Sequence, residues 1–165
     1  MSNEAAPVEQ VAKFMHAHDL RMTTAESCTA GLIAATLADI PGTGALLDCA
    51  YVVYSPEAKQ QCVGVRPETL ERFNLTSEEV AREMALGALN SSRANLAVSN
   101  TGVTDDTDKR IPAGTQCFAW AFKDTAAASP RLYSETRRFS GDRNEIRDAA
   151  ARYALSRIQT YFSYR

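Results

Sequence analysis

The sequence predicts a layered α/β domain with a mixed sheet, and three observations carry this prediction. Strand-like and helical patterns alternate through the first part of the chain, which is the order of parallel α/β units. Two strand-like patterns then follow each other directly, at 115–122 and 132–139, and the small-residue turn at 126–130 favours an antiparallel pair. No repeat and no linker-like stretch divides the chain, so residues 1–165 are expected to form a single domain.

The helices before residue 100 are indicated by apolar residues at helical spacing and by capping residues. Pro41-Gly42 ends the second helix. Ser55-Pro56-Glu57 has the order of an N-cap, a first helical residue and an acidic first turn, and Thr76-Ser77-Glu78-Glu79 has the pattern of a capping box. The expected helices are 7–18, 32–40, one that begins near 55, a short one from 66, and one that begins at 76.

The expected strands are short runs rich in β-branched and aromatic residues. They cover 21–25, 50–54, 96–100, 115–122 and 132–139. A last helix is expected from about Gly141 to Phe162, with Ile146 on its buried stripe. The segment 101–114 is polar and irregular, which predicts a loop between the third and fourth strands.

Composition argues against several classes of protein. A formal net charge of −2 gives no support for nucleic acid or an anionic membrane as a partner. No apolar run approaches the ~20 residues that a membrane-spanning helix needs. Segment 1–7 lacks the basic and apolar regions of a secretory signal, so a cytoplasmic location is expected.

No metal site is expected from the cysteines and histidines. The cysteine spacings match no zinc pattern, and in a reducing cytoplasm the thiols are expected to be free. The four cysteines are Cys28, Cys49, Cys62 and Cys117. The two histidines, His16 and His18, lie together near the N-terminus and are expected to be solvated residues at a helix end.

The most informative segment is Thr24-Ala25-Glu26-Ser27-Cys28-Thr29-Ala30-Gly31, a hydroxyl-rich turn between an expected strand and an expected helix. Such a turn directs N–H groups and the positive end of a helix dipole into a cleft, where they can hold a phosphate or stabilise an oxyanion. Ser27 in this turn can be a nucleophile if a base removes its proton. It can also be only a helix cap, and from spacing alone that interpretation is the more common one.

Lys59 is the base that the sequence offers to Ser27. A lysine can remove a proton when burial or nearby positive charge lowers its pKa toward neutrality. If the strands ending at Ala25 and Tyr54 are neighbours, Ser27, Lys59 and Tyr54 converge at the carboxyl edge of the sheet, where open α/β sheets bind ligands. Tyr54 could then relay a proton or orient the base. The alternative is a solvated lysine and a half-buried strand tyrosine.

Two further segments could contact a ligand. Ser140-Gly141-Asp142-Arg143 precedes the last helix, where Asp142 could cap the helix and Arg143 could bind a phosphate or carboxylate as a bidentate donor. Thr101-Gly102 follows a strand. A glycine there allows a ligand to approach the backbone closely, although it could also serve only in a turn.

Taken in order, these segments resemble the CinA carboxy-terminal domain family, the nicotinamide-nucleotide amidases, over about residues 8–162. Segment 24–31 carries much of the resemblance. Further matching segments are Tyr54-Ser55-Pro56-Glu57-Ala58-Lys59, Val63-Gly64-Val65-Arg66-Pro67-Glu68-Thr69-Leu70, Thr101-Gly102, Pro112-Ala113-Gly114-Thr115 and Phe139-Ser140-Gly141-Asp142-Arg143. The resemblance implies a three-layer α/β/α sandwich with a mixed, mostly parallel sheet. It also implies hydrolysis of nicotinamide mononucleotide to nicotinic acid mononucleotide and ammonia, in pyridine nucleotide salvage, without a cofactor or metal.

By this resemblance Ser27 is the nucleophile and Lys59 the general base, with Tyr54 close by. Backbone N–H groups near Thr29 and Gly31 would stabilise the anionic intermediate. The remaining substrate contacts would come from Thr101, Gly102 and Arg143. The implied partner is a small pyridine nucleotide, and because family members tend to self-associate, a homodimer is expected.

The chain departs from the family pattern at the rim of the expected pocket. A glycine-rich loop is replaced by Gly102 to Ile111, which keeps only the first glycine and contains three aspartates, and Ala30 replaces a second glycine. Two hypotheses therefore remain: an amidase with altered substrate tolerance, or a catalytically impaired paralogue that binds nucleotides or other partners. A thiol enzyme that uses Cys28 is a third and weaker hypothesis.

Overall fold

The centre of the computed structural model, which describes residues 5–164, is one five-stranded sheet with the order β2-β1-β3-β4-β5. The strands are β1 (Met22–Glu26), β2 (Leu47–Val52), β3 (Leu96–Gly102), β4 (Thr115–Phe122) and β5 (Arg131–Arg138). β1 pairs parallel with β2 and with β3, whereas β4 pairs antiparallel with β3 and with β5. Of the strands described, β4 alone runs against the others, so the expected mixed, mostly parallel sheet is confirmed. The expectation drawn from segment 1–7 falls partly on residues 1–4, outside the described residues.

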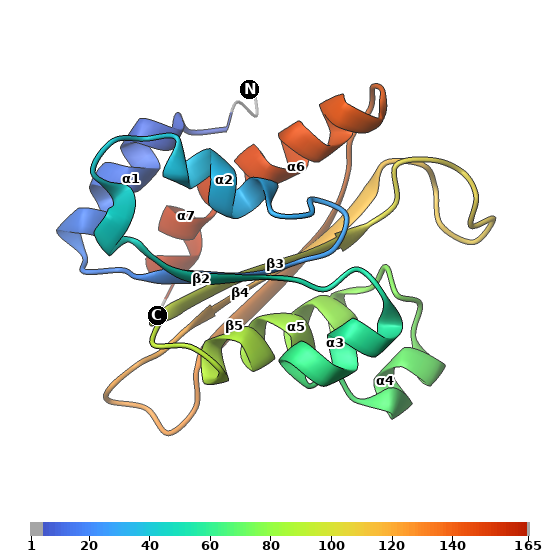
Figure 1. Cartoon of the computed structure of the whole chain (residues 1–165), viewed down its shortest axis with the longest axis horizontal. Helices are drawn as coiled ribbons and strands as arrows, with labels where there is room; N and C mark the ends of the chain where they lie inside the picture. Colours follow the sequence, from blue (N-terminus) through green and yellow to red (C-terminus); the bar gives the residue numbers. More distant parts are fainter. Residues whose placement is uncertain (1–4, 165) are drawn as a thin grey trace.

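Helices cover both faces of this sheet and complete the expected three layers. They are α1 (Val8–Ala17), α2 (Leu32–Ala38), a short 3-10 helix η1 (Thr43–Ala45), α3 (Pro56–Val63), α4 (Pro67–Arg72), α5 (Glu78–Asn90), α6 (Arg143–Ser156) and α7 (Ile158–Phe162). Figure 1 shows α1, α2, α6 and α7 on one face, and α3, α4 and α5 on the other. No helix between residues 5 and 164 has the length and apolar character needed to cross a membrane.

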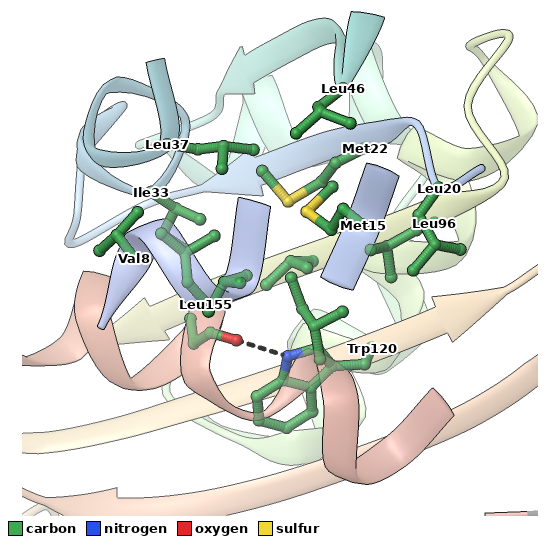
Figure 2. Packing of buried hydrophobic residues seen from close by; sticks show 14 of the residues in the cluster. Val8, Met15, Leu20, Met22, Ile33, Leu37, Leu46, Leu96, Trp120 and Leu155 are labelled. Atoms are coloured by element: carbon green, nitrogen blue, oxygen red, sulfur yellow. Dashed lines mark hydrogen bonds between the residues drawn. The ribbon is translucent and has the colours of Figure 1, made fainter. Parts of the chain in front are cut away.

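Each face of the sheet has its own core. Under α1, α2 and α6 the core consists of long apolar side chains around Trp120, whose indole N–H donates to the carbonyl of Ala154 at 2.9 Å (Figure 2). On the other face α5 contributes many alanines, which permits close packing. A Cβ atom added at Gly87 would lie 1.6 Å from the carbonyl oxygen of Val63. The glycine therefore lets α3, which carries Lys59, lie directly against α5.

The observed elements differ from the expected ones mainly at their ends. β2 is Leu47–Val52, because its first residue pairs with Met22 at the start of β1, and Tyr54 therefore lies beyond the strand. The expected last helix is divided at Arg157 into α6 and α7. The second piece places the Tyr161 ring 4.7 Å from the Trp120 ring, in the same core.

Candidate active site at the carboxyl end of the sheet

Ser27 is the first residue after β1, the strand that lies between β2 and β3. Its N–H donates to the carbonyl of Asn100 at 3.0 Å, which extends the contact with β3 by one residue. The residue is only 8 % exposed. Its hydroxyl lies at the carboxyl edge of the sheet, with segments from β2 and β3 on its two sides.

Lys59 reaches the same point from α3, on the β2 side. Its Nζ donates to Ser27 Oγ at 3.0 Å and to the carbonyl oxygens of Val53 and Tyr54, each at 2.9 Å. The lysine is 1 % exposed, and burial lowers its pKa from 10.5 to about 8. Within residues 5–164 no carboxylate forms an ion pair with it. Lys59 is thus a buried amine stabilised by dipoles alone.

The three acceptors around the Lys59 nitrogen determine where its lone pair points after it loses a proton. The carbonyls of Val53 and Tyr54 can only accept, so the two remaining N–H bonds stay on them. The lone pair then faces Ser27 Oγ, whose hydroxyl can donate to it. The geometry is that of a serine within hydrogen-bond reach of its proton acceptor.

Tyr54 contributes to this site through its backbone carbonyl, while its side chain contacts a different group. The phenol is exposed (55 %), and its oxygen accepts a hydrogen bond from Arg143 Nη2 at 3.1 Å. Arg143 Nη1 donates to Thr104 Oγ1 at 2.8 Å. Among the described residues, the Tyr54 hydroxyl makes no hydrogen bond with Ser27 or Lys59. Arg143 therefore links the segment after β2 to the loop after β3.

The N–H groups expected to stabilise an oxyanion are already engaged, and this requires a correction. The N–H of Thr29 donates to Asn100 Oδ1 at 3.1 Å, and that of Gly31 donates to Glu26 Oε1 at 3.1 Å. The buried Glu26 carboxylate also accepts from the N–H groups of Ile33 and Ala34, so it caps α2. The start of this helix is occupied by the protein's own carboxylate and is not free to hold a substrate phosphate.

At Gly102 the structure shows a steric reason for the absence of a side chain that was not expected from the sequence. A Cβ atom at this position would lie 2.2 Å from Gln116 Oε1, so the glycine makes room for a side chain of β4. Its neighbour Thr101 is buried, and its hydroxyl donates to the carbonyl of Leu75 at 2.9 Å. Both residues still line the cavity beside Ser27.

A cavity of about 440 Å³ opens beside the Ser27–Lys59 pair, a volume suited to a small ligand. Its lining includes Asn74, Asp108 and Arg110. Asn74 Nδ2 donates to Asp108 at 2.8 Å and, with Arg110, holds the pKa of this carboxyl at about 2. Asp108 is thus used to tie the loop after β3, drawn in yellow at the right of Figure 1, to the segment after α4.

Cys28 and the histidines do not form an alternative centre. Burial raises the pKa of the Cys28 thiol, which makes it a poorer nucleophile and weakens the thiol hypothesis. His16 and His18 are exposed at the end of α1 and its cap, where His16 contacts Gly42 and His18 packs on Phe14. No group of His, Cys, Asp and Glu side chains that could hold a metal ion is present in residues 5–164.

Four residues of the site were missed by reasoning from sequence, and they share one property. Each is a polar side chain that holds the turn after β1 or the start of α2. They are Glu26, Asn100, Gln116 and Arg147. The available signal was a charged or amide residue inside or directly after an expected strand, because such a side chain is rarely buried without a partner. That signal applies to the first three, whereas Arg147, whose Nε donates to the Cys28 carbonyl at 2.9 Å, lies in a helix and does not carry it.

Comparison with known proteins gives consistent results. The family model described as "CinA C-terminal domain" matches residues 4–162. "Nicotinamide-nucleotide amidohydrolase PncC" of Escherichia coli (strain K12) is 42 % identical over 158 residues, which cover 93 % of this chain and 92 % of that protein. A "CinA-like protein" of Chlorobium limicola is 38 % identical over 93 % of this chain, which corresponds to 36 % of that longer protein.

Solved structures have the same fold. The competence damage-inducible protein A (ComA) of Klebsiella pneumoniae has a TM-score of 0.87 and 33 % identity, with 95 % of each chain covered. The competence/damage inducible protein CihA of Agrobacterium tumefaciens has a TM-score of 0.85 and 34 % identity, covering 99 % of this chain and all of that one (100 %). The α/β layers described above are therefore those of a known group of proteins.

Proposed function

Because this chain belongs to the CinA C-terminal domain family, we propose that it is a nicotinamide-nucleotide amidase that acts by a serine–lysine mechanism. The observation that carries the proposal is the 3.0 Å contact between Lys59 Nζ and Ser27 Oγ beside a ligand-sized cavity. The substrate class is supported by the 42 % identity to relatives named nicotinamide-nucleotide amidohydrolase. A cytoplasmic location, a role in pyridine nucleotide salvage and a homodimeric state are parts of the same proposal.

The reaction begins with attack of Ser27 Oγ on the carboxamide carbon, while the hydroxyl proton moves to Lys59 Nζ. The carbon–nitrogen bond of the tetrahedral intermediate then breaks. Lys59 returns the proton to the leaving nitrogen, which departs as ammonia and leaves the acyl group on Ser27. A water molecule attacks this ester, gives its proton to Lys59 and releases the acid product, after which the proton returns to Ser27.

Arg143 supplies the positive charge that an anionic substrate needs near this centre. Its guanidinium donates to two neutral hydroxyls, those of Tyr54 and Thr104, and it has no carboxylate ion-pair partner in the described part of the chain. A guanidinium whose charge is not neutralised by a salt bridge retains its attraction for phosphate. We therefore assign Arg143 to substrate binding, and Tyr54 to orienting Arg143 and, through its carbonyl, Lys59.

The second hypothesis, a nucleotide-binding paralogue without amidase activity, is favoured by one feature. The rim of the cavity contains Asp108 and Arg110 in the segment where the family's glycine-rich loop is expected. These side chains change the lining of the cavity but leave the Ser27–Lys59 contact in place. The two hypotheses therefore differ in turnover and agree on binding.

The test is ammonia release from nicotinamide mononucleotide by the purified chain. Ser27→Ala and Lys59→Met should each abolish release, whereas Lys13→Met, which removes an exposed lysine of α1, should not affect it. Circular dichroism checks that each variant is folded. Binding of the nucleotide by calorimetry without any ammonia above background would establish the second hypothesis instead.

A further inference from the structure

The turn after β1 leaves one backbone N–H group without a partner. The N–H of Ser27 donates to Asn100 O, that of Thr29 to Asn100 Oδ1, and that of Gly31 to Glu26. The next donors are also engaged, because Ala30 donates to the Ser27 carbonyl and Leu32 to the Thr29 carbonyl. Within residues 5–164, the N–H of Cys28 donates to no acceptor. Cys28 is a buried residue that lines the cavity, and N–H groups of buried residues are almost always paired, so this exception marks a donor that is available to a ligand.

The free N–H of Cys28 belongs to the residue after Ser27, and acyl-transfer enzymes commonly use the N–H of the residue after the nucleophile as an oxyanion donor. Ser27 lines the same cavity as Cys28. When Ser27 Oγ bonds to the carboxamide carbon, the negative oxygen on that carbon develops within reach of the turn. Preorganised N–H donors aimed at this oxygen are among the largest contributions to catalysis.

Asn100 holds the backbone on both sides of this N–H. Its carbonyl accepts from the Ser27 N–H at 3.0 Å, and its side-chain oxygen accepts from the Thr29 N–H at 3.1 Å. Cys28 lies between these two bonds. Asn100 is fully buried, so the orientation of the Cys28 N–H depends on how the amide group of Asn100 is oriented.

Gln116 determines that orientation through a chain of hydrogen bonds with only one consistent direction. The Val103 carbonyl can only accept, so the group facing it at 3.1 Å is the Gln116 NH₂. The Gln116 oxygen therefore accepts from Asn100 Nδ2, at 2.8 Å. The remaining atom of the Asn100 amide is its oxygen, which then faces the Thr29 N–H.

We infer that Gln116 is a positioning residue of the proposed amidase, which acts through Asn100 to hold the free Cys28 N–H as the oxyanion donor. The inference rests on the proposed serine–lysine chemistry. It also explains the absence of a side chain at Gly102, because a Cβ atom there would displace the Gln116 amide.

The test replaces Gln116 with methionine, which has a similar length and no hydrogen-bonding amide. Removal of a complete oxyanion donor typically lowers kcat by a factor of about 10²–10³. A displaced donor should lower kcat by at least about tenfold, with KM changed by less than about twofold. The midpoint of the pH profile should not move, because the groups that contact Lys59 are unchanged.

Two comparisons separate positioning from general loss of structure. Ser99→Ala is the matched control, because it removes another buried hydrogen bond of β3, from Ser99 Oγ to the Ala81 carbonyl, and leaves the turn unchanged. The kcat of this variant should stay within about twofold of that of the unaltered chain. Gln116→Glu introduces a buried carboxyl group, for which burial favours the protonated form. That form keeps an O–H that can donate to the Val103 carbonyl and an oxygen that can accept from Asn100 Nδ2, so it should recover part of the activity lost in Gln116→Met. If Gln116→Met does not fold, the kinetics of Gln116→Glu are used in its place. A kcat that is lower by about threefold or more, at unchanged KM, would then support the inference. Unchanged kcat, or a loss that lies wholly in KM, would overturn the inference.

A second readout does not depend on the identity of the substrate. In its reaction with a fluorophosphonate, an activated serine bonds to phosphorus and displaces fluoride, and negative charge builds up on the phosphoryl oxygen in the transition state. The rate of labelling at Ser27 can be followed by intact mass spectrometry. Labelling should be at least about tenfold slower in Gln116→Met than in the unaltered chain. If the chain is labelled but releases no ammonia from nicotinamide mononucleotide, the proposed substrate fails and this inference stands. Equal labelling rates, or no labelling of the unaltered chain, would overturn it.

Discussion

The pH dependence of hydrolysis tests the role of Lys59 most directly, because a lysine acts as a base only when it is neutral. Burial lowers its pKa from 10.5 to about 8. At pH 7 about 10 % of such an amine is neutral, compared with about 0.03 % of an ordinary lysine, a gain of roughly 300-fold in the active form. The value of kcat/KM should therefore rise about tenfold per pH unit below 8 and become constant above it.

The same burial has a cost in stability whose sign can be worked out. The fall in pKa from 10.5 to about 8 corresponds to about 3 kcal/mol against the charged amine in the folded state. Between these two pH values the unfolded chain binds more protons than the folded chain, so the free energy of unfolding should increase with pH in this window. The destabilisation caused by burying the charged Lys59 amine is fully present below pH 8 and is absent above the pKa that Lys59 has in the unfolded chain.

The assay measures ammonia release directly between pH 6 and 9.5. The low-pH limb of the kcat/KM profile reports the pKa of the base in the free enzyme. Lys59→Met should release no ammonia at any pH in this range, and its free energy of unfolding should no longer increase between pH 8 and 10.5. A profile that is flat from pH 6 to 9, or one that is still rising steeply between pH 9 and 9.5, would refute the assignment of Lys59 as the base.

Three further predictions concern the frame around the site. Glu26→Gln removes a carboxylate that accepts hydrogen bonds from two hydroxyls and three N–H groups, so the free energy of unfolding in urea should fall by about 3 kcal/mol; a fall below about 1 would contradict the capping role. Gly87→Ala should lower the free energy of unfolding by about 2–3 kcal/mol, because the added Cβ would overlap the Val63 carbonyl. In the control Gly44→Ala no atom lies within 4 Å of the added Cβ, so the free energy of unfolding should change by less than about 0.5 kcal/mol in the same experiment. Ile146→Ala should cost about 2–4 kcal/mol because this side chain of α6 is only 2 % exposed; a change below about 0.5 would show that the burial has been misjudged.

The layers of the fold and the meeting of Ser27 with Lys59 could be predicted because both depend on local patterns. Hydrophobic periodicity identifies each element, and parallel neighbouring strands bring their carboxyl ends to one edge. The family resemblance is confirmed over nearly the same range by the match to residues 4–162.

The partners of individual N–H groups could not be predicted, because they depend on residues far away in the chain. The Thr29 N–H bonds to a side chain 71 residues away, and Asn100 bonds to Gln116 on a third strand. The direction of the Tyr54 phenol is similarly set by Arg143, which lies 89 residues later. Spacing alone does not contain the register between β3 and β4, so the free donor at Cys28 emerges only from coordinates.

The amine of Lys59 is held by main-chain oxygens at positions 53 and 54, and any amino acid provides such an oxygen. Replacement of Val53 or Tyr54 would therefore keep these two acceptors for the Lys59 amine, as long as the path of the chain is kept. We therefore expect substitutions elsewhere in the cavity lining to change which ligand is bound while the contact between Lys59 and Ser27 is kept.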